Sequence, residues 1–265
     1  MRSVFGLAAL ALVGCVSAEG AHDQEDVGGS DDALTALEDE IGFDGAIGKL
    51  DITTLESIDA ESRTLEAAGH SEGELDRTAT RSTLTAVLRQ RKAKATGIHA
   101  QLDLYDTDLF KLNGLEQKLC SAHRIVCVRV AIAAFKARGA SQAEYRDGNV
   151  GGRIDCFRHT YWNAAMTRAV GADYAKQWAD AHENGYPENR ATAKDRLLSD
   201  MDFFNNDVGR KIGKAHEDDS DGDTKQAVRD AISKGDVRAV RYDLGDANGK
   251  LVPSSQCTDR VRCGT

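Results

Sequence analysis

Apolar residues recur at helical intervals through the C-terminal part of the chain. From Leu115 to Arg138, Leu, Ile, Val and Phe return every three or four positions, which predicts one helix ending at Gly139. Similar spacing, with glycines between the segments, predicts four further helices, near 153–170, 172–184, 194–213 and 224–234. Weak alternation over 239–252, around an Asp-Ala-Asn-Gly sequence, predicts a β-hairpin. We therefore expect a mainly α fold with a helical, bundle-like domain over residues 112–265.

The N-terminal part has a different pattern. Residues 16–48 are acidic, contain glycine and have few aromatic side chains, which predicts a flexible, disordered tether. Residues 49–111 contain helical stretches and predict a helical stalk or small subdomain. The expected order along the chain is a leader over 1–15, the tether, the stalk and the helical domain.

The leader has the pattern of an export signal. Arg2 supplies a positive charge, and Val4 to Val13 form an apolar run that is too short to cross a bilayer comfortably. The run ends in Leu-Val-Gly-Cys15, which resembles the lipobox of bacterial lipoproteins. This resemblance implies that Cys15 is lipidated and anchors the protein in a membrane of the bacterial cell envelope. The alternative is ordinary secretion, with cleavage after the small residues 16–18, and both interpretations place the mature protein outside the cytoplasm.

The remaining cysteines fit an oxidising compartment, where close pairs form disulfides. Cys120 can pair with Cys127 if the helix turns or unwinds between them, and Cys257 can pair with Cys263 around a small loop. Cys156 is then left over as a buried thiol or as a partner in another connectivity. Zinc binding by these cysteines is a poor alternative, because the chain has no CxxC pair with matching partners.

The net charge of -9 is concentrated near the N-terminus. Residues 19–45 hold ten acidic side chains and no lysine or arginine, and the chain after residue 45 is neutral. A nucleic-acid-binding protein is expected to have a basic surface, so no nucleic-acid partner is expected here.

Polar residues interrupt the apolar faces of three predicted helices. His159 and Asn163 share such a face on the first helix, His182 lies on that of the second, and Asn205 lies on that of the third. If the helices pack together, these side chains meet in a buried layer, and leaving each unpaired costs about 1 to 3 kcal/mol. They must therefore pair with each other, with water, with a metal or with a substrate. Further polar residues border the same layer: Arg158, Asp180, Glu183, Asp202 and Asn206.

Two functions fit this polar layer. In the first, the protein is an exported hydrolase of ester or phosphodiester bonds, with His159 as general base and a carboxylate that orients it. The expected catalytic residues are His159, His182, Glu183 and Asp202, and the expected substrate-binding residues are Arg158, Asn163, Asn205 and Asn206. In the alternative, the protein is a non-catalytic envelope lipoprotein, a binding or structural module whose polar layer only fixes helix packing. A solvent-reachable cleft beside His159 favours the enzyme, whereas a sealed and fully paired network favours the module.

Three sequence blocks carry a resemblance to a known family. Arg158-His-Thr-Tyr-Trp-Asn163, Asp180-Ala-His-Glu183 and Met201-Asp-Phe-Phe-Asn-Asn206 with Gly209-Arg210 resemble an uncharacterised bacterial domain with RHxYWN, DAHE and MDxxNNxxGR blocks. The resemblance covers about residues 112–235, and the domain occurs in exported and toxin-like proteins. It implies no established activity. Where Phe204 stands, the family often has histidine, which puts a complete metal site in doubt.

Three further sequence patterns bear on metal binding. Cys156-Phe-Arg-His159 resembles the start of the catalytic helix of secreted phospholipase A2, but Thr160 replaces the aspartate that binds calcium there, so that activity is not expected. A divalent metal, zinc or manganese, could instead be bound by His182 with Asp180 or Glu183, together with His159 and Asp202 from the neighbouring helices. The acidic loop 217–223 fails as an EF-hand, because the twelfth position is Val228, and is interpreted as a solvated turn.

Overall fold

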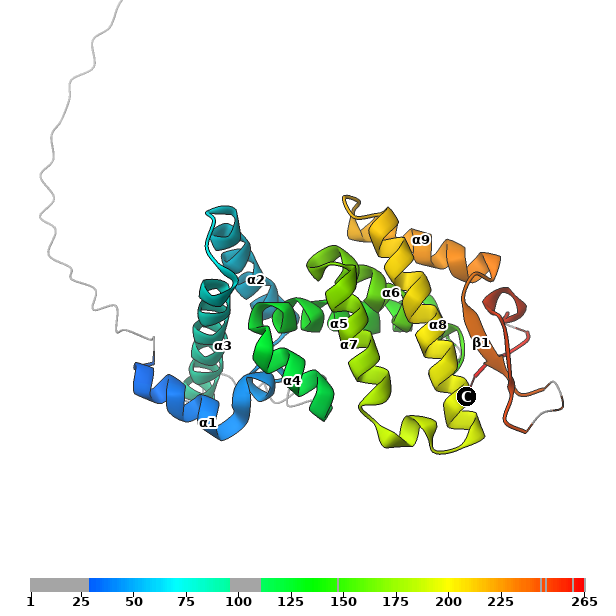
Figure 1. The fold of residues 1–265 in the computed structure, drawn as a ribbon, viewed down its shortest axis with the longest axis horizontal. Coiled ribbons are helices and arrows are strands. Elements are labelled where there is room, and N and C mark those ends of the chain that lie inside the picture. The colour runs from blue at the N-terminus through cyan, green and yellow to red at the C-terminus, as the bar shows by residue number, and fades with distance from the viewer. Residues whose placement is uncertain are drawn as a thin grey trace, which may run out of the picture.

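The computed structural model describes residues 29–95, 111–146, 148–243, 245, 247–258 and 260–264. Helices dominate, and the strands of the described part form one two-stranded sheet, so the predicted mainly α fold is confirmed (Figure 1). The helices are α1 (Asp31–Ile47), α2 (Ile52–Ala67), α3 (Glu72–Ala95), α4 (Gly114–Ala122), α5 (Arg124–Glu144), α6 (Arg153–Val170), α7 (Ala172–Asn184), α8 (Ala193–Ala215) and α9 (Asp221–Lys234). The short 3₁₀ helices are η2 (Pro187–Arg190) and η3 (Ser254–Gln256), and the strands are β1 (Arg238–Arg241) and β2 (Lys250–Pro253).

Helix α1 corrects the predicted extent of the tether. Ser30 caps this helix by accepting a hydrogen bond from the backbone N–H of Ala33, and its apolar side chains, Leu34, Leu37 and Phe43 among them, are buried. The high acidic content of this segment predicted solvated chain, but its apolar residues recur at helical spacing and pack against α3. The folded part therefore begins well before residue 48, and residues 16–28 of the predicted tether, like Cys15, lie outside the described residues.

The predicted helix over 115–138 is two helices. It breaks at His123, which ends α4 and begins α5, and this break lets Cys120 and Cys127 form a disulfide with a Cα–Cα distance of 4.8 Å. The second helix does not stop at Gly139 but continues to Glu144. Gly139 is compatible with the helix interior because glycine in a helix costs only about 1 kcal/mol relative to alanine.

Helix α6 is the centre of the C-terminal part, and α5, α7, α8 and α9 pack around it (Figure 1). Two glycines let α8 cross α6 at backbone contact distance. A Cβ at Gly209 would lie 2.2 Å from the carbonyl oxygen of Thr160, and one at Gly213 would lie 2.5 Å from that of Ala164. Because these glycines are one turn apart, they form a continuous flat surface on α8, which brings the polar residues of α8 against those of α6.

The predicted hairpin is confirmed, and it packs at the end of α6 and α8. Strands β1 and β2 are antiparallel, with Val240 opposite Leu251. The N–H of Val240 also donates to the carbonyl oxygen of Gly151, which ties the sheet to the loop before α6. A disulfide between Cys257 and Cys263, as predicted, closes the chain behind the hairpin.

Two further expectations concern the cysteines and membranes. Cys156 is a free, buried thiol, which was one of the two alternatives left open. Within the ranges that the structure describes, no helix is both long enough and apolar enough to cross a membrane.

Candidate functional site

Helices α6, α7 and α8 bring one histidine and three carboxyl groups together. Nε2 of His159 lies 3.4 Å from Oδ1 of Asp155, one turn earlier on α6, and 3.5 Å from Oδ1 of Asp202 on α8. On the other side of the ring, Nδ1 lies 3.5 Å from Oε1 of Glu183 on α7 and 3.3 Å from Oδ1 of Asn206 on α8. Each ring nitrogen therefore faces acidic or amide oxygens, and the ring is held from both sides.

Amide side chains form a supporting layer behind this histidine. Asn163 donates through Nδ2 to Oδ1 of Asn206 at 2.7 Å, and Asn206 donates to Oε1 of Glu183 at 3.2 Å. Arg210 donates in turn to Oδ1 of Asn163 at 3.1 Å. Since both asparagines are fully buried and bonded within the protein, they position His159 and Glu183 rather than contact a substrate.

A second histidine–carboxylate pair lies nearby. Nδ1 of His182 on α7 is 2.9 Å from Oε1 of Glu116 on α4, and the rings of His182 and His159 have centroids 6.2 Å apart. The buried Glu116 is part of a capping box, because its other oxygen accepts a hydrogen bond from the N–H of Asn113 at 2.8 Å. Asn113 also donates to the carbonyl oxygen of Ala181, which locks α4 onto α7. The second imidazole is therefore anchored at Nδ1, while its side chain stays 39% exposed.

A cleft of about 430 Å³ opens beside these groups. It is lined by both histidines, His159 and His182, by the carboxyl groups of Asp155, Glu183 and Asp202, and by Arg158. Oδ1 of Asp202 is buried and has no hydrogen-bond partner among the described residues. The polar layer is thus neither sealed nor fully paired, which is the condition that favours an enzyme over a packing module.

The crowding of charges shifts the pKa values of the buried groups. Burial disfavours a charged imidazole, but the charges of Asp202, Asp155 and Glu183 outweigh burial and raise the pKa of His159 from 6.5 to about 9. Burial, with repulsion from Asp155 and Glu183, raises the pKa of Asp202 well above its usual range. Burial opposes ionisation of Asp155 too, but contact with His159 and Arg158 keeps the pKa of this carboxyl below its usual range. With only protons to balance it, the cluster therefore keeps His159 charged, so this histidine does not accept a proton as an isolated general base would.

Asp155 and Glu116 are the members of this site that the sequence analysis missed. Asp155 precedes His159 by four residues, so the helical spacing could have identified it. The apolar face on which His159 was predicted to lie includes the neighbouring Cys156 instead. In the structure, Asp155 accepts hydrogen bonds from the side chain of Arg158 and, at 2.6 Å, from the backbone N–H of Gly151. Glu116 lies 66 residues from His182 and no local spacing points to it.

Other residues singled out from the sequence lie away from the cleft. Asn205 points away from the cleft toward β1, where its amide bonds both the N–H (2.8 Å) and the carbonyl (2.9 Å) of Arg238, so it fixes β1 and not a substrate. Asp180 forms an ion pair with Lys176 and does not line the cleft, so the expected metal pair of Asp180 with His182 is not assembled. Phe204 is 40% exposed and stacks under the guanidinium of Arg238.

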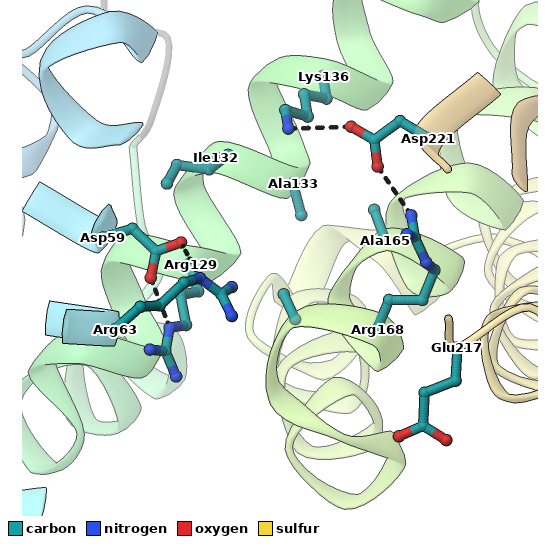
Figure 2. Close-up of a pocket in the computed structure, with 11 residues that line it drawn as sticks. Asp59, Arg63, Arg129, Ile132, Ala133, Lys136, Ala165, Arg168, Glu217 and Asp221 are labelled. Atoms are coloured by element: carbon teal, nitrogen blue, oxygen red, sulfur yellow. Dashed lines mark hydrogen bonds and ion pairs between the residues drawn. The ribbon is translucent and has the colours of Figure 1, made fainter. Parts of the chain in front are cut away.

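A second cleft, of about 300 Å³, lies where α2 meets α5, α6 and the start of α9 (Figure 2). Its basic side chains are paired with acids: Lys136 and Arg168 both bond Asp221, and Arg129 bonds Asp59 (Figure 2). These ion pairs join helices from distant parts of the sequence. The acidic segment 217–223, predicted as a solvated turn, supplies the acid of two of them, because Asp221 begins α9. The cleft has no histidine and no buried carboxyl group without a partner, so we do not assign the reaction to it.

Comparison with known proteins places the histidine cluster inside a recognised domain. Residues 117–236 match the family described as a domain of unknown function, DUF6973. The match includes both cleft histidines and Asp155, Glu183 and Asp202, and it agrees with the expected resemblance to an uncharacterised domain. No curated protein and no solved structure matches the chain. The functional conclusion therefore depends on the geometry of the cleft.

Proposed function

We propose that this protein is a hydrolase that cleaves ester or phosphodiester bonds in the cleft beside His159. The observation that carries the proposal is that two imidazole rings and the three carboxyl groups around His159 line one solvent-connected cleft of about 430 Å³. Buried ionisable groups that converge on a cleft are typical of active sites, because chemistry requires charges that folding alone does not.

The arrangement suggests a role for each group. A water molecule facing Nε2 of His159 and the Oδ1 atoms of Asp155 and Asp202 could give its proton to a carboxylate, while the charged His159 orients it for attack. Glu116 holds Nδ1 of His182, and the ring centroid of His182 lies 6.2 Å from that of His159. His182 is therefore placed to protonate the leaving oxygen. Arg158 at the margin would stabilise the negative charge that builds up on the attacked ester or phosphate group.

The test is hydrolysis of p-nitrophenyl esters and of bis-p-nitrophenyl phosphate by the purified full chain, with Mn²⁺ or Zn²⁺ added in one series and EDTA in another. We expect turnover, and a loss of about 100-fold or more in kcat for His182→Asn, because general acid catalysis contributes about that factor. His216→Asn is the matched control, since His216 is also held at Nδ1 by a carboxylate, Asp219 at 2.6 Å, but lies outside this cleft. Absence of turnover in every series, or equal losses in the two variants, would overturn the proposal.

The amide layer behind His159 is the one feature of the described site that favours the alternative, a non-catalytic module. Asn163, Asn206 and Arg210 bond one another inside the protein, as a network that only fixes helix packing would do. The unpartnered Oδ1 of Asp202 and the open cleft are not explained in that way. The same assay decides between the two functions.

We also propose that the enzyme works outside the cytoplasm, anchored by a lipid on Cys15. Support comes from the two disulfides, Cys120–Cys127 and Cys257–Cys263, which persist in oxidising compartments. Mass spectrometry of the protein isolated from its cells tests the anchor. A diacylated cysteine at the mature N-terminus is expected, and cleavage after residues 16–18 without lipid would show secretion instead.

A further inference from the structure

We propose that Asp155, His159 and Asp202 form a binding site for one divalent transition-metal ion of the Mn²⁺ or Zn²⁺ type. The donor set is two carboxylate oxygens and one imidazole nitrogen, which suits these ions. Of the ligands suggested by the sequence it keeps His159 and Asp202, and Asp155 takes the place of the α7 residues. This inference shares the cleft of the proposed hydrolase, but it concerns ion binding and is tested without a substrate.

The donor atoms are already close to coordination spacing. Two ligands at tetrahedral positions about 2.1 Å from an ion are about 3.4 Å apart. Nε2 of His159 lies 3.4 Å from Oδ1 of Asp155 and 3.5 Å from Oδ1 of Asp202, and all three atoms lie within 4.8 Å of one another. Asp155 is held by the N–H of Gly151, whereas Oδ1 of Asp202 is buried with no hydrogen-bond partner among the described residues. Asp202 can therefore move toward an ion without breaking a bond at Oδ1.

The other side of His159 has the surroundings expected for a metal ligand. Nδ1 faces two acceptors, Oδ1 of Asn206 and Oε1 of Glu183, so its proton is directed to that side. The lone pair of a neutral imidazole then lies on Nε2 and points between two carboxylates, an arrangement that is repulsive unless a proton or a metal cation lies there. Histidine ligands of metals commonly donate their second N–H to a carboxylate or carbonyl oxygen in this manner.

Charge balance points to a divalent ion. An ion would displace the protons of this cluster and leave His159 neutral and all three carboxyl groups ionised. In that state Asp155, Glu183 and Asp202 contribute three negative charges and Arg158 one positive charge, so the cluster carries two negative charges. One divalent cation makes the cluster neutral. In Asp155, the oxygen that accepts from Arg158 has a second lone pair for the ion. With only three protein ligands, the ion would keep open positions toward the cleft, as catalytic metals do.

The test is calorimetric titration of the chelator-treated full chain with MnCl₂, repeated with ZnCl₂. We expect one ion per chain and, at a hundredfold excess over the dissociation constant, a rise of about 5 °C in the unfolding midpoint. The Asp202→Asn variant, which removes one ligand and no hydrogen bond at Oδ1, is expected to weaken binding by about 100-fold. Glu188→Gln is the matched control, because Glu188 is an exposed acid that lines the same cleft, and its binding constant should stay within about threefold.

Each outcome decides the proposal. Neither heat nor a shift of the midpoint with both ions would overturn it, as would an Asp202→Asn variant that binds like the wild type. Equal weakening by Glu188→Gln would show only diffuse attraction to an acidic cleft and would also overturn it. If no ion binds but the protein hydrolyses substrate in EDTA, the metal site is refuted and the proposed function is not. If one ion binds but no substrate is hydrolysed, the proposed function is refuted and the metal site is not.

Discussion

Substituting Gly209 by alanine tests how the site is assembled, because the substitution adds one methyl group where α8 crosses α6. That methyl group would lie 2.2 Å from the carbonyl oxygen of Thr160 and 2.8 Å from Cβ of Asn163, whereas ordinary contact begins at 3.4 Å. Thr160 presents backbone that cannot rotate away, so the two helices must separate by about 1 Å. The separation falls directly beside the 2.7 Å hydrogen bond between Asn163 and Asn206.

The expected magnitude combines a gain and two losses. Replacing glycine by alanine inside a helix gains about 1 kcal/mol through helix propensity. Overpacking a tight contact costs about 1 to 3 kcal/mol, and loosening a buried hydrogen bond costs about 1 kcal/mol more. We therefore expect Gly209→Ala to lower the free energy of unfolding by about 2 kcal/mol.

Urea unfolding followed by circular dichroism measures this difference. The matched control is Gly139→Ala, because Gly139 also lies inside a helix but a Cβ there would meet nothing within 4 Å. The control should gain about 0.5 to 1 kcal/mol, so the two variants are expected to change stability in opposite directions. A Gly209→Ala protein as stable as the wild type would refute the close crossing of α6 and α8 and, with it, the positions given to the cluster.

Three further changes test other parts of the structure. Asn205→Ala removes both hydrogen bonds to the backbone of Arg238 and should lower the free energy of unfolding in urea by about 2 kcal/mol, with kcat of the folded protein unchanged. A loss of kcat without a loss of stability would show that Asn205 contacts the substrate. Replacing Cys120 and Cys127 together by alanine opens a loop of seven residues and should cost about 2 to 3 kcal/mol under non-reducing conditions, and no loss would contradict the disulfide. The pKa of Asp221 is lowered below 3.8 because the lysine and arginine that it bonds outweigh its partial burial. Its ionised form therefore stabilises the fold above about pH 4, so the stability gap between wild type and Asp221→Asn should be constant near neutrality and shrink as the pH falls below 4.

The part of the site that the sequence predicted is the part that local spacing determines. His159 and Asn163 are four residues apart and had to share one face of a helix, His182 interrupted the apolar face of the next helix, and Asp202 was predicted at the border of the same layer. Once α6, α7 and α8 pack together, these residues meet without further assumptions.

What could not be predicted depends on contacts between distant segments. Glu116 reaches His182 only because a capping box on α4 docks against α7. Asn205 and Asn206 are neighbours that looked equivalent in the sequence, yet successive residues of a helix point about 100° apart, so one supports His159 and the other holds β1. The direction of each side chain is fixed by the crossing of α8 over α6, which the chain spacing does not specify.

The distribution of satisfied and unsatisfied groups distinguishes the two functions that the sequence left open. A network that only specifies packing gains by pairing every buried polar atom, since each unpaired one costs about 1 to 3 kcal/mol. The amides behind His159 follow this rule, as do Asp155 and Glu116. Asp202 does not, because Oδ1 of this residue is buried without a hydrogen-bond partner among the described residues, beside two further carboxyl groups and at the edge of a cleft. A carboxyl oxygen that contacts His159 at 3.5 Å but accepts no hydrogen bond from any described residue, at the edge of a cleft, is the arrangement expected when a ligand of the cleft supplies that bond.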